Sequence, residues 1–412
     1  MRGPYSDRKG LKAHQQRELK KFAKKVLINS PFYKSYCQNE TVLWDAMPEI
    51  TKTEFMANFN SINTCNMTIE EAMPFALAAE KNRSFKNEIN GVTIGLSTGT
   101  SGKRGLFLVS ENERAQWVAL VMSRVIKPRL FQKQKIAFFL RANSNLYASV
   151  SSSLFEFRYF DIFQPIDKLL IELNDFAPQI IAAQPSVLMD IAQAQQSGHI
   201  MVWPNQIISF AEVLHQKDKE FIESQLPARI TEVYQCTEGF LGVSCEYGTL
   251  HLNEDFIHIE KDWIDEDTFY PIITDFSRSS QPIVKYKLND VLQVKKKPCS
   301  CGSQLLALEK IIGRDDDVLN FNTQKIYPDL IARRIAITCN HFYNYTISQV
   351  KSDLLEVQIE CNEIDYDTLQ IQFKEVISNL LQELGVRGVE IDCRRDIVRV
   401  SGNKLRKIIC KI

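Results

Sequence analysis

The segment LSTGTSGKRG at residues 96–105 combines hydroxyl side chains with three glycines and two basic residues. Glycines let backbone N–H groups approach a polyanion closely, and Lys103 adds a point charge, which suits the phosphates of a nucleotide. The Walker A pattern needs a glycine five residues before Gly102, and Ser97 occupies that position. Apolar residues flank the segment on both sides and predict two strands joined by a turn. An ordinary glycine-rich hairpin turn is the alternative.

Two later segments carry carboxylates directly after predicted strands. The first, YQCTEG at residues 234–239, places Thr237 and Glu238 where ligands bind at the carboxyl ends of strands, so they can meet a phosphate and its Mg²⁺. The second, YKLND at residues 286–290, ends in Asp290, whose carboxylate can accept hydrogen bonds from both hydroxyls of a ribose.

Two further segments carry cations. The segment GRDD at residues 313–316 has Arg314, suited to a phosphate or ribose, followed by a predicted hinge. The segment SGNK at residues 401–404 places Lys404 on a glycine-containing loop. Each of these segments alone is typical of a solvated loop, whereas the five in this order indicate a nucleotide site.

A second group of residues has the chemistry of a metal site. Cys299 and Cys301 form a short thiol pair, and Cys245 and His251 precede them in the same region. Three thiolates and one imidazole satisfy tetrahedral Zn²⁺ with no open position, so such a site would be structural. Buried cysteines without a metal are the alternative. We expect the other seven cysteines to be small core residues: Cys37, Cys65, Cys236, Cys339, Cys361, Cys393 and Cys410.

The composition is that of a globular protein without a strong charge preference. The 412 residues carry 50 basic and 50 acidic side chains, so no global basic field draws the chain to nucleic acid or to anionic lipid. We find no apolar run of membrane-spanning length and no signal peptide, and we expect no membrane partner. Ten cysteines without an export signal favour reduced thiols or metal ligands in the cytoplasm.

The elements that must position these residues alternate between strand and helix. An amphipathic helix is predicted at 12–28, a second helix from about residue 51, and a third after the capping box of Ser110 and Glu113. Such alternation predicts an α/β fold with a mostly parallel sheet covered on both faces. The predicted strands are 135–140, 179–183, 206–210 and 229–234, and the helices between them are 186–196 and 216–225.

The pattern changes twice along the chain. Residues 241–297 contain short alternating apolar runs and predict a β-rich part within a large N-terminal domain, 1–315. We extend this β-rich part to residue 310, so that it contains the zinc residues. Residues 316–412 predict a small, mobile α+β domain, with a strand at 354–361, a helix at 367–384 and a strand at 387–393.

These segments together resemble the adenylate-forming superfamily of acyl-CoA synthetases. The chain is most similar to the compact branch that contains phenylacetate–CoA ligase, coenzyme F390 synthetase and CapK. The resemblance runs from Pro31-Phe32-Tyr33 through Ala211-Glu212-Val213-Leu214 to Lys404. Some relatives in this branch show the same cysteine and histidine arrangement, which favours the structural zinc ion.

The resemblance implies an ATP site with named phosphate contacts. Thr237 would hold the α-phosphate and Glu238 the Mg²⁺, and both are candidate catalytic residues with Lys103. Attack of a carboxylate on the α-phosphate brings two anions together, so positioned cations are the main catalytic tool. The glycine-rich segment would wrap the β- and γ-phosphates with Ser97, Thr98, Gly99, Thr100, Ser101, Gly102 and Lys103.

The rest of the nucleotide is assigned in the same way. Ala211 and Glu212 would line the adenine, and Tyr234 would stack on it. Asp290 would bind the ribose and Arg314 would contact the nucleotide. The small domain would rotate about a hinge at Asp316, and Lys404 would reach the carboxylate and the α-phosphate in the adenylating conformation.

The implied activity is ATP-dependent ligation of a small, aryl or acyl carboxylic acid. The acid would form an acyl-AMP with release of pyrophosphate and then pass to a thiol, coenzyme A first and a carrier protein second. Asn289 stands where the commoner motif has glycine, and the loop at 320–323 lacks the usual glycine; the second departure bears on thioester formation more than on adenylation. Transfer to an amine or hydroxyl, as in F390 synthetase, and a catalytically silent nucleotide-binding protein are the alternatives. A homodimer is also left open.

Substitution of Lys404 by alanine tests the proposed role of the C-terminal loop. We expect Lys404→Ala to slow adenylate formation far more than it weakens ATP binding, by about 2–4 kcal/mol of transition-state stabilisation. Thioester formation from a pre-made adenylate should survive. Single-turnover assays of the two half-reactions measure this, and an equal loss in both would contradict the role of Lys404.

Overall fold

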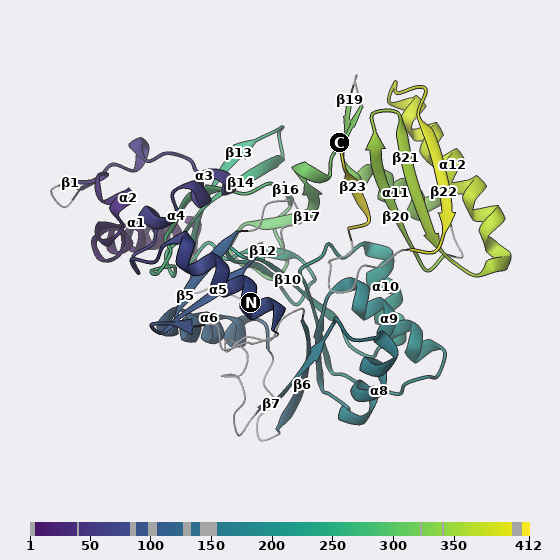
Figure 1. The fold of residues 1–412 in the computed structure, drawn as a ribbon, viewed down its shortest axis with the longest axis horizontal. Helices are drawn as coiled ribbons and strands as arrows, with labels where there is room; N and C mark the ends of the chain where they lie inside the picture. The colour runs from purple at the N-terminus through teal and green to yellow at the C-terminus, as the bar shows by residue number, and fades with distance from the viewer. Residues whose placement is uncertain are drawn as a thin grey trace. The chain divides into compact units, whose positions relative to one another are not determined.

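The computed structural model describes residues 5–38, 41–82, 88–97, 105–126, 133–140, 155–321, 324–339, 342–397 and 406–412. These residues pack as two units (Figure 1). The first unit comprises residues 1–288 and 293–310, and the second comprises 289–292 and 311–412. β16 (Asp290–Val294) and β17 (Ala307–Arg314) each contribute residues to both units. Among the helices within these ranges, none combines the length and apolar character needed to cross a bilayer.

Five parallel strands form the centre of the first unit. Their order is β10-β9-β8-β6-β7, and every neighbouring pair is parallel. The predicted α/β fold is confirmed, since strands and helices alternate along this part of the chain. The strands are β6 (Gln134–Leu140), β7 (Phe155–Asp161), β8 (Ile180–Ala183), β9 (Gln206–Phe210) and β10 (Ile230–Cys236), and the helices are α8 (Ile166–Phe176), α9 (Pro185–Gln196) and α10 (Gln216–Gln225).

Helices cover both faces of these strands. Alternate side chains of a strand point to opposite faces, so neighbouring residues pack against different helices. Ile181 and Ile207 pack in one cluster with residues of α8, α9 and α10. Ile180 and Ile208, their neighbours along the strands, pack in a second cluster with Trp117 and other residues of α6 (Glu111–Arg124). Because both faces of the strands are covered, successive residues are buried, and this explains the near-continuous apolar runs from which the strands were predicted.

The sheet continues with antiparallel strands after residue 238. β10 pairs with β11 (Gly239–Ser244), β11 with β12 (Leu250–Leu252) and β12 with β17. Beside them β13 (Ile257–Trp263), β14 (Thr268–Asp275) and β15 (Ile283–Lys287) form antiparallel pairs. The predicted mostly parallel sheet is thus parallel at its centre and antiparallel in the predicted β-rich region.

A separate hairpin carries the glycine-rich segment. β4 (Val92–Leu96) pairs with β5 (Leu106–Ser110), and the short β3 (Glu88–Ile89) lies beside β4. A Cβ atom on Gly95 would lie 2.0 Å from the Phe107 ring, so only glycine lets this ring cross the hairpin. The two predicted strands are confirmed, and helices precede them: α1 (Arg8–Lys25), α2 (Pro31–Lys34), α3 (Lys52–Ala57), α4 (Phe59–Ile62) and α5 (Ile69–Lys81).

The capping box at the start of α6 has a second function. Ser110 donates to Glu113 from its backbone and hydroxyl, at 2.7 Å each, as predicted. The same carboxylate is buried and accepts hydrogen bonds from the backbone N–H groups of Ser279 at 2.6 Å and Ser280 at 3.0 Å. Glu113 therefore ties the hairpin to the loop between β14 and β15.

The second unit is an α+β layer, as predicted from its pattern. Its sheet has the order β22-β21-β20-β23, and α11 and α12 share its apolar cluster (Figure 1). The bounds are β18 (Leu319–Phe321), β19 (Gln324–Ile326), α11 (Pro328–Thr338), β20 (Asn344–Lys351), β21 (Leu354–Glu360), α12 (Tyr366–Glu383), β22 (Glu390–Arg395) and β23 (Ile408–Cys410).

Replacement of Glu113 by glutamine should destabilise the first unit. The glutamine side chain has the same size, but it has one acceptor oxygen where the carboxylate has two, so some of the present donors lose their acceptor. We therefore expect a loss of about 2–4 kcal/mol in the free energy of unfolding. Urea unfolding followed by circular dichroism measures the change. Glu111→Gln, an exposed residue in the same helical turn, is the matched control. Equal stability of both variants would contradict the anchoring role of Glu113.

Candidate functional site

A hollow in the first unit brings together predicted residues from separate segments. Ser97 of the glycine-rich segment lines it, as do Thr237 and Glu238 from the turn between β10 and β11. The hollow opens to solvent. The predicted phosphate-binding serine and the predicted magnesium-binding glutamate therefore share one cavity.

The base of the glycine-rich segment is closed by two hydrogen bonds. The Ser97 N–H donates to the Gly105 carbonyl at 2.8 Å, and the Gly105 N–H donates to the Ser97 hydroxyl at 2.7 Å. Ser97 is buried, and through these two hydrogen bonds it joins the two ends of the loop. Thr98, Gly99, Thr100, Ser101, Gly102 and Lys103, the rest of the predicted phosphate loop, lie outside the described residues.

Glu238 is held in the hollow by a tyrosine. The Tyr286 hydroxyl donates to Glu238 Oε1 at 2.9 Å. Burial and the adjacent Glu238 both raise the pKa of Tyr286, so the phenol stays protonated and continues to donate. A carboxylate whose orientation is fixed by a hydrogen bond is suited to bind a divalent cation.

Two cations in the hollow were not found by the sequence reasoning. Lys52, the first residue of α3, donates from Nζ to the Ser97 hydroxyl at 3.1 Å. Arg278 lies in the loop after β14 and also lines the hollow. Neither lies in a phosphate-binding motif, and both reach the site only through tertiary packing.

A buried carboxylate supports this side of the hollow. Asp275 accepts hydrogen bonds from the Ser277 backbone at 2.8 Å and the Ser277 hydroxyl at 2.6 Å. Complete burial raises the pKa of Asp275 to about 6. A Cβ atom on Gly239 would lie 3.0 Å from Asp275 Oδ2, so this carboxyl packs directly behind the residue that follows Glu238.

The residues predicted to bind adenine lie at the carboxyl ends of two neighbouring parallel strands. Val233 of β10 pairs with Phe210 of β9, which places Tyr234 and Ala211 one step further along each strand. Ala211 has a φ of 71°, so the chain turns sharply after β9. Glu212 accepts from the Ser186 N–H at 3.1 Å and the Ser186 hydroxyl at 3.2 Å, and so also caps the first turn of α9.

The remaining predicted residues belong to the second unit or lie outside the described ranges. Arg314 Nε donates to Asp290 Oδ1 at 3.3 Å, so these two predicted nucleotide contacts are brought together. Asp316 lies in the one-turn helix η3 (Asp315–Asp317), whose Asp317 forms an ion pair with Arg406. Lys404 is outside the described residues. The roles of all of these residues stay predictions.

The four predicted zinc residues converge on one point. The ligand atoms of Cys245, His251, Cys299 and Cys301 all lie within 4.8 Å of one another. Cys245 Sγ lies 3.6 Å from Cys299 Sγ, and Cys301 Sγ lies 3.3 Å from His251 Nε2. Two sulfurs bound to one tetrahedral zinc ion are about 3.8 Å apart, whereas a disulfide has about 2.05 Å. The spacing fits a metal site and excludes a disulfide between Cys245 and Cys299.

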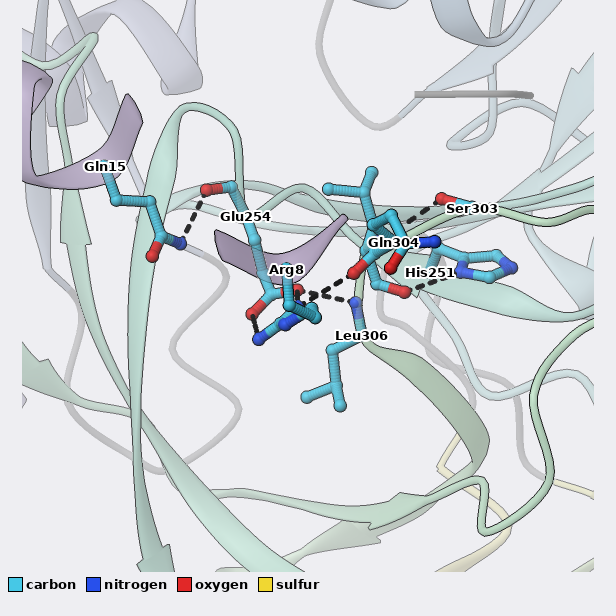
Figure 2. Close-up of polar contacts among 8 residues, drawn as sticks. Arg8, Gln15, His251, Glu254, Ser303, Gln304 and Leu306 are labelled. Atoms are coloured by element: carbon cyan, nitrogen blue, oxygen red, sulfur yellow. Dashed lines mark hydrogen bonds and ion pairs between the residues drawn. The ribbon is translucent and has the colours of Figure 1, made fainter. Parts of the chain in front are cut away.

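The surroundings orient the histidine for a metal. The Nδ1 atom of His251 lies 3.0 Å from the Leu305 carbonyl and donates to it, which leaves Nε2 facing the thiols. Figure 2 shows the polar contacts that hold the segment 303–306, which contains Leu305. Glu254 accepts from the Leu306 N–H at 2.6 Å and from Arg8 of α1 at 2.9 Å, and Arg8 also donates to the Gln304 carbonyl at 2.9 Å.

One thiol of the cluster is prepared for metal binding. Burial raises the pKa of the Cys299 thiol, but hydrogen bonds from the Cys301 backbone and from Thr249 and His251 outweigh it and lower this pKa to about 6. Burial and the neighbouring Cys299 raise the pKa of Cys301 to about 11, so Cys299 is the more acidic thiol of the two. The thiolate is the form that binds metals. The chemistry and spacing of the four donors fit Zn²⁺.

Two curated proteins are similar to the chain in sequence. Protein CapK of Staphylococcus aureus is 22% identical over 379 residues, which cover 85% of this chain and 76% of CapK. Phenylacetate-coenzyme A ligase of Thermus thermophilus is 22% identical over 220 residues, which cover 48% of each protein. No family model matches the chain.

A solved structure shares the fold over nearly the whole chain. The structure of 2-hydroxyisobutyryl-CoA ligase, in the postadenylation state in complex with 2-HIB-AMP, has a TM-score of 0.73 and 17% identity. The match covers 98% of this chain and 90% of that ligase. The two proteins therefore have the same fold.

Elemental analysis tests the cysteine cluster as a zinc site. We expect one zinc ion per chain in protein purified without added metal, and chelation should lower the melting temperature because a closed site contributes folding energy. Cys299→Ser with Cys301→Ser should lose the zinc. Cys37→Ser with Cys65→Ser, which leave the cluster intact, should retain it. Substoichiometric zinc that does not change in the first double variant would exclude the site.

Proposed function

We infer that the chain belongs to the adenylate-forming superfamily, near CapK and phenylacetate–CoA ligase, and from this premise we propose that it is an AMP-forming acid–thiol ligase. It activates a small carboxylic acid with ATP and passes the acyl group from acyl-AMP to coenzyme A. The observation that supports this most is the shared hollow of Ser97, Thr237 and Glu238, which come from two distant parts of the chain.

The first half-reaction needs charge neutralisation more than acid–base chemistry. A carboxylate oxygen attacks the α-phosphorus, and pyrophosphate leaves with the electron pair of the broken P–O bond. We assign the α-phosphate to the hydroxyl of Thr237 and the divalent cation to Glu238. Tyr286 holds the Glu238 carboxylate at 2.9 Å, so its orientation is set before the nucleotide binds.

The nucleoside takes the positions that the strand ends offer. We place the adenine beside Ala211, Glu212 and Tyr234, at the carboxyl ends of β9 and β10, where ligands bind in parallel sheets. We assign the ribose to Asp290, with Arg314 beside it at 3.3 Å. The carboxylate of Asp290 can accept from both ribose hydroxyls once the nucleotide is present.

The second half-reaction requires a different set of groups over the same nucleotide. We propose that the second unit rotates about Asp316, so that Lys404 serves adenylation and the segment after the hinge serves the thiol. Acceptors other than coenzyme A include a carrier-protein thiol. For the acid we propose an aromatic carboxylate first, because the name of the Thermus thermophilus relative specifies phenylacetate.

Pyrophosphate exchange into ATP across a panel of aryl and aliphatic acids tests the activity. We expect exchange that depends on one class of acid, and an acyl thioester in the mass spectrum once coenzyme A is added. Glu238→Gln should reduce the exchange rate by about a hundredfold or more, since a ligand to the transferred charge is lost. Glu266→Gln, an exposed residue in the turn after β13, is the matched control.

Exchange without any acid, or the same rate in Glu238→Gln as in the unaltered protein, would contradict the proposal. If exchange depends on an acid but no thioester forms with coenzyme A, the acyl group is transferred to a different acceptor.

A further inference from the structure

The N-terminal helix α1 is attached to the turn that follows the strand of the predicted zinc-binding histidine. That strand, β12, carries His251, and the turn begins directly after its last residue. Gln15 of α1 is buried and donates from Nε2 to the Glu254 carbonyl in this turn at 2.8 Å. The Nε2 atom of His14 lies 2.7 Å from the next carbonyl, that of Asp255. Two neighbouring side chains of α1 therefore contact the backbone of the turn.

The Glu254 side chain connects this attachment to the zinc loop, residues 299–306, which contains two of the predicted zinc-binding cysteines. Its carboxylate is buried and accepts from the Leu306 N–H at 2.6 Å. Arg8 of α1 donates to both oxygens of the carboxylate, at 2.5 and 2.9 Å, and also to the Gln304 carbonyl at 2.9 Å (Figure 2). One guanidinium therefore joins α1, the turn and the zinc loop.

The zinc loop in turn holds the histidine. The Leu305 carbonyl lies 3.0 Å from His251 Nδ1, and the Leu306 carbonyl accepts from the Leu252 N–H at 2.9 Å. These contacts leave His251 Nε2 at 3.3 Å from Cys301 Sγ. A shift of the backbone at residues 305 and 306 would therefore move one predicted zinc ligand relative to another.

The charge of Glu254 depends on Arg8. The Glu254 side chain is 5% exposed, whereas that of Arg8 is 43% exposed. Within the described part of the chain, the donors to this carboxylate are Arg8 and the Leu306 N–H. A buried carboxylate that loses its cationic partner is strongly destabilising. Loss of Arg8 should therefore draw water in between the turn and the zinc loop.

We propose that Arg8 and Glu254 are positioning residues of the zinc site, and that the docking of α1 and the binding of zinc stabilise each other. The inference rests on the assignment of the cysteine cluster to Zn²⁺ and not on the proposed adenylation. Residues that orient metal ligands from outside commonly change metal affinity by 10- to 100-fold. Because such coupling is reciprocal, a helix that strengthens zinc binding is itself held more firmly in the zinc-loaded protein.

The zinc affinity of the full chain, measured by competition with a chromogenic chelator, tests the first half of the proposal. We expect Arg8→Gln and Glu254→Gln each to weaken zinc binding by about tenfold or more. Arg8→Lys keeps the charge but not the paired contact with the carboxylate, so it should recover part of the affinity. Lys9→Gln, which changes the neighbouring exposed residue of α1, is the matched control and should bind zinc as the unaltered protein does.

Melting temperatures with and without zinc separate coupling from a merely structural role of the ion pair. A structural role would lower both temperatures equally in Arg8→Gln, whereas coupling should reduce the rise that zinc produces. Removal of zinc should also speed amide hydrogen exchange in residues 8–25 of the unaltered protein.

An unchanged zinc affinity in Arg8→Gln, or the same exchange rate of α1 with and without zinc, would overturn the inference. Absence of zinc binding in the unaltered protein would overturn it as well, together with the zinc site, and would leave the proposed ligase activity standing.

Discussion

The buried carboxylate of Glu113 is the interaction on which the candidate site depends. Its oxygens accept from Ser110, at the end of the hairpin that carries the glycine-rich segment, and from Ser279 and Ser280, beside Arg278. A buried carboxylate is costly unless its oxygens are fully hydrogen-bonded, and here several donors satisfy it. Because the donors come from distant segments, the charge can be satisfied only when the hairpin and the loop are in register.

The position of the hollow follows from this anchoring and from the sheet. The parallel strands β9 and β10 end side by side, and the chain continues from β10 through Thr237 and Glu238 into the antiparallel β11. Tyr286 of β15 then reaches Glu238, and the hairpin supplies Ser97. The large sheet and the separate hairpin thus place polar side chains around one space, while the cysteine cluster lies at the other end of β11 and β12.

Local patterns in the sequence were sufficient to predict the elements and part of the site. Alternation and apolar runs identified β4, β5, β6, β8 and β9, and the Ser110–Glu113 capping box was correct because its donors and acceptors are three residues apart. β7 and α8 were not predicted; in β7, Glu156, Arg158 and Asp161 interrupt the apolar pattern. Lys52, Arg278 and the second role of Glu113 depend on contacts between segments far apart in the chain, which no local pattern encodes.

The central claim is that a carboxylate attacks the α-phosphorus of ATP, and isotope transfer tests it most directly. The protein is incubated with ATP and with a free carboxylic acid that it accepts as substrate, whose carboxyl group carries ¹⁸O. Coenzyme A is present to complete the turnover. The account predicts that one ¹⁸O atom from the acid appears in AMP, because the oxygen that attacks phosphorus stays on it when the acyl group leaves. Appearance of the label in inorganic phosphate, with ADP as the nucleotide product, would contradict the account.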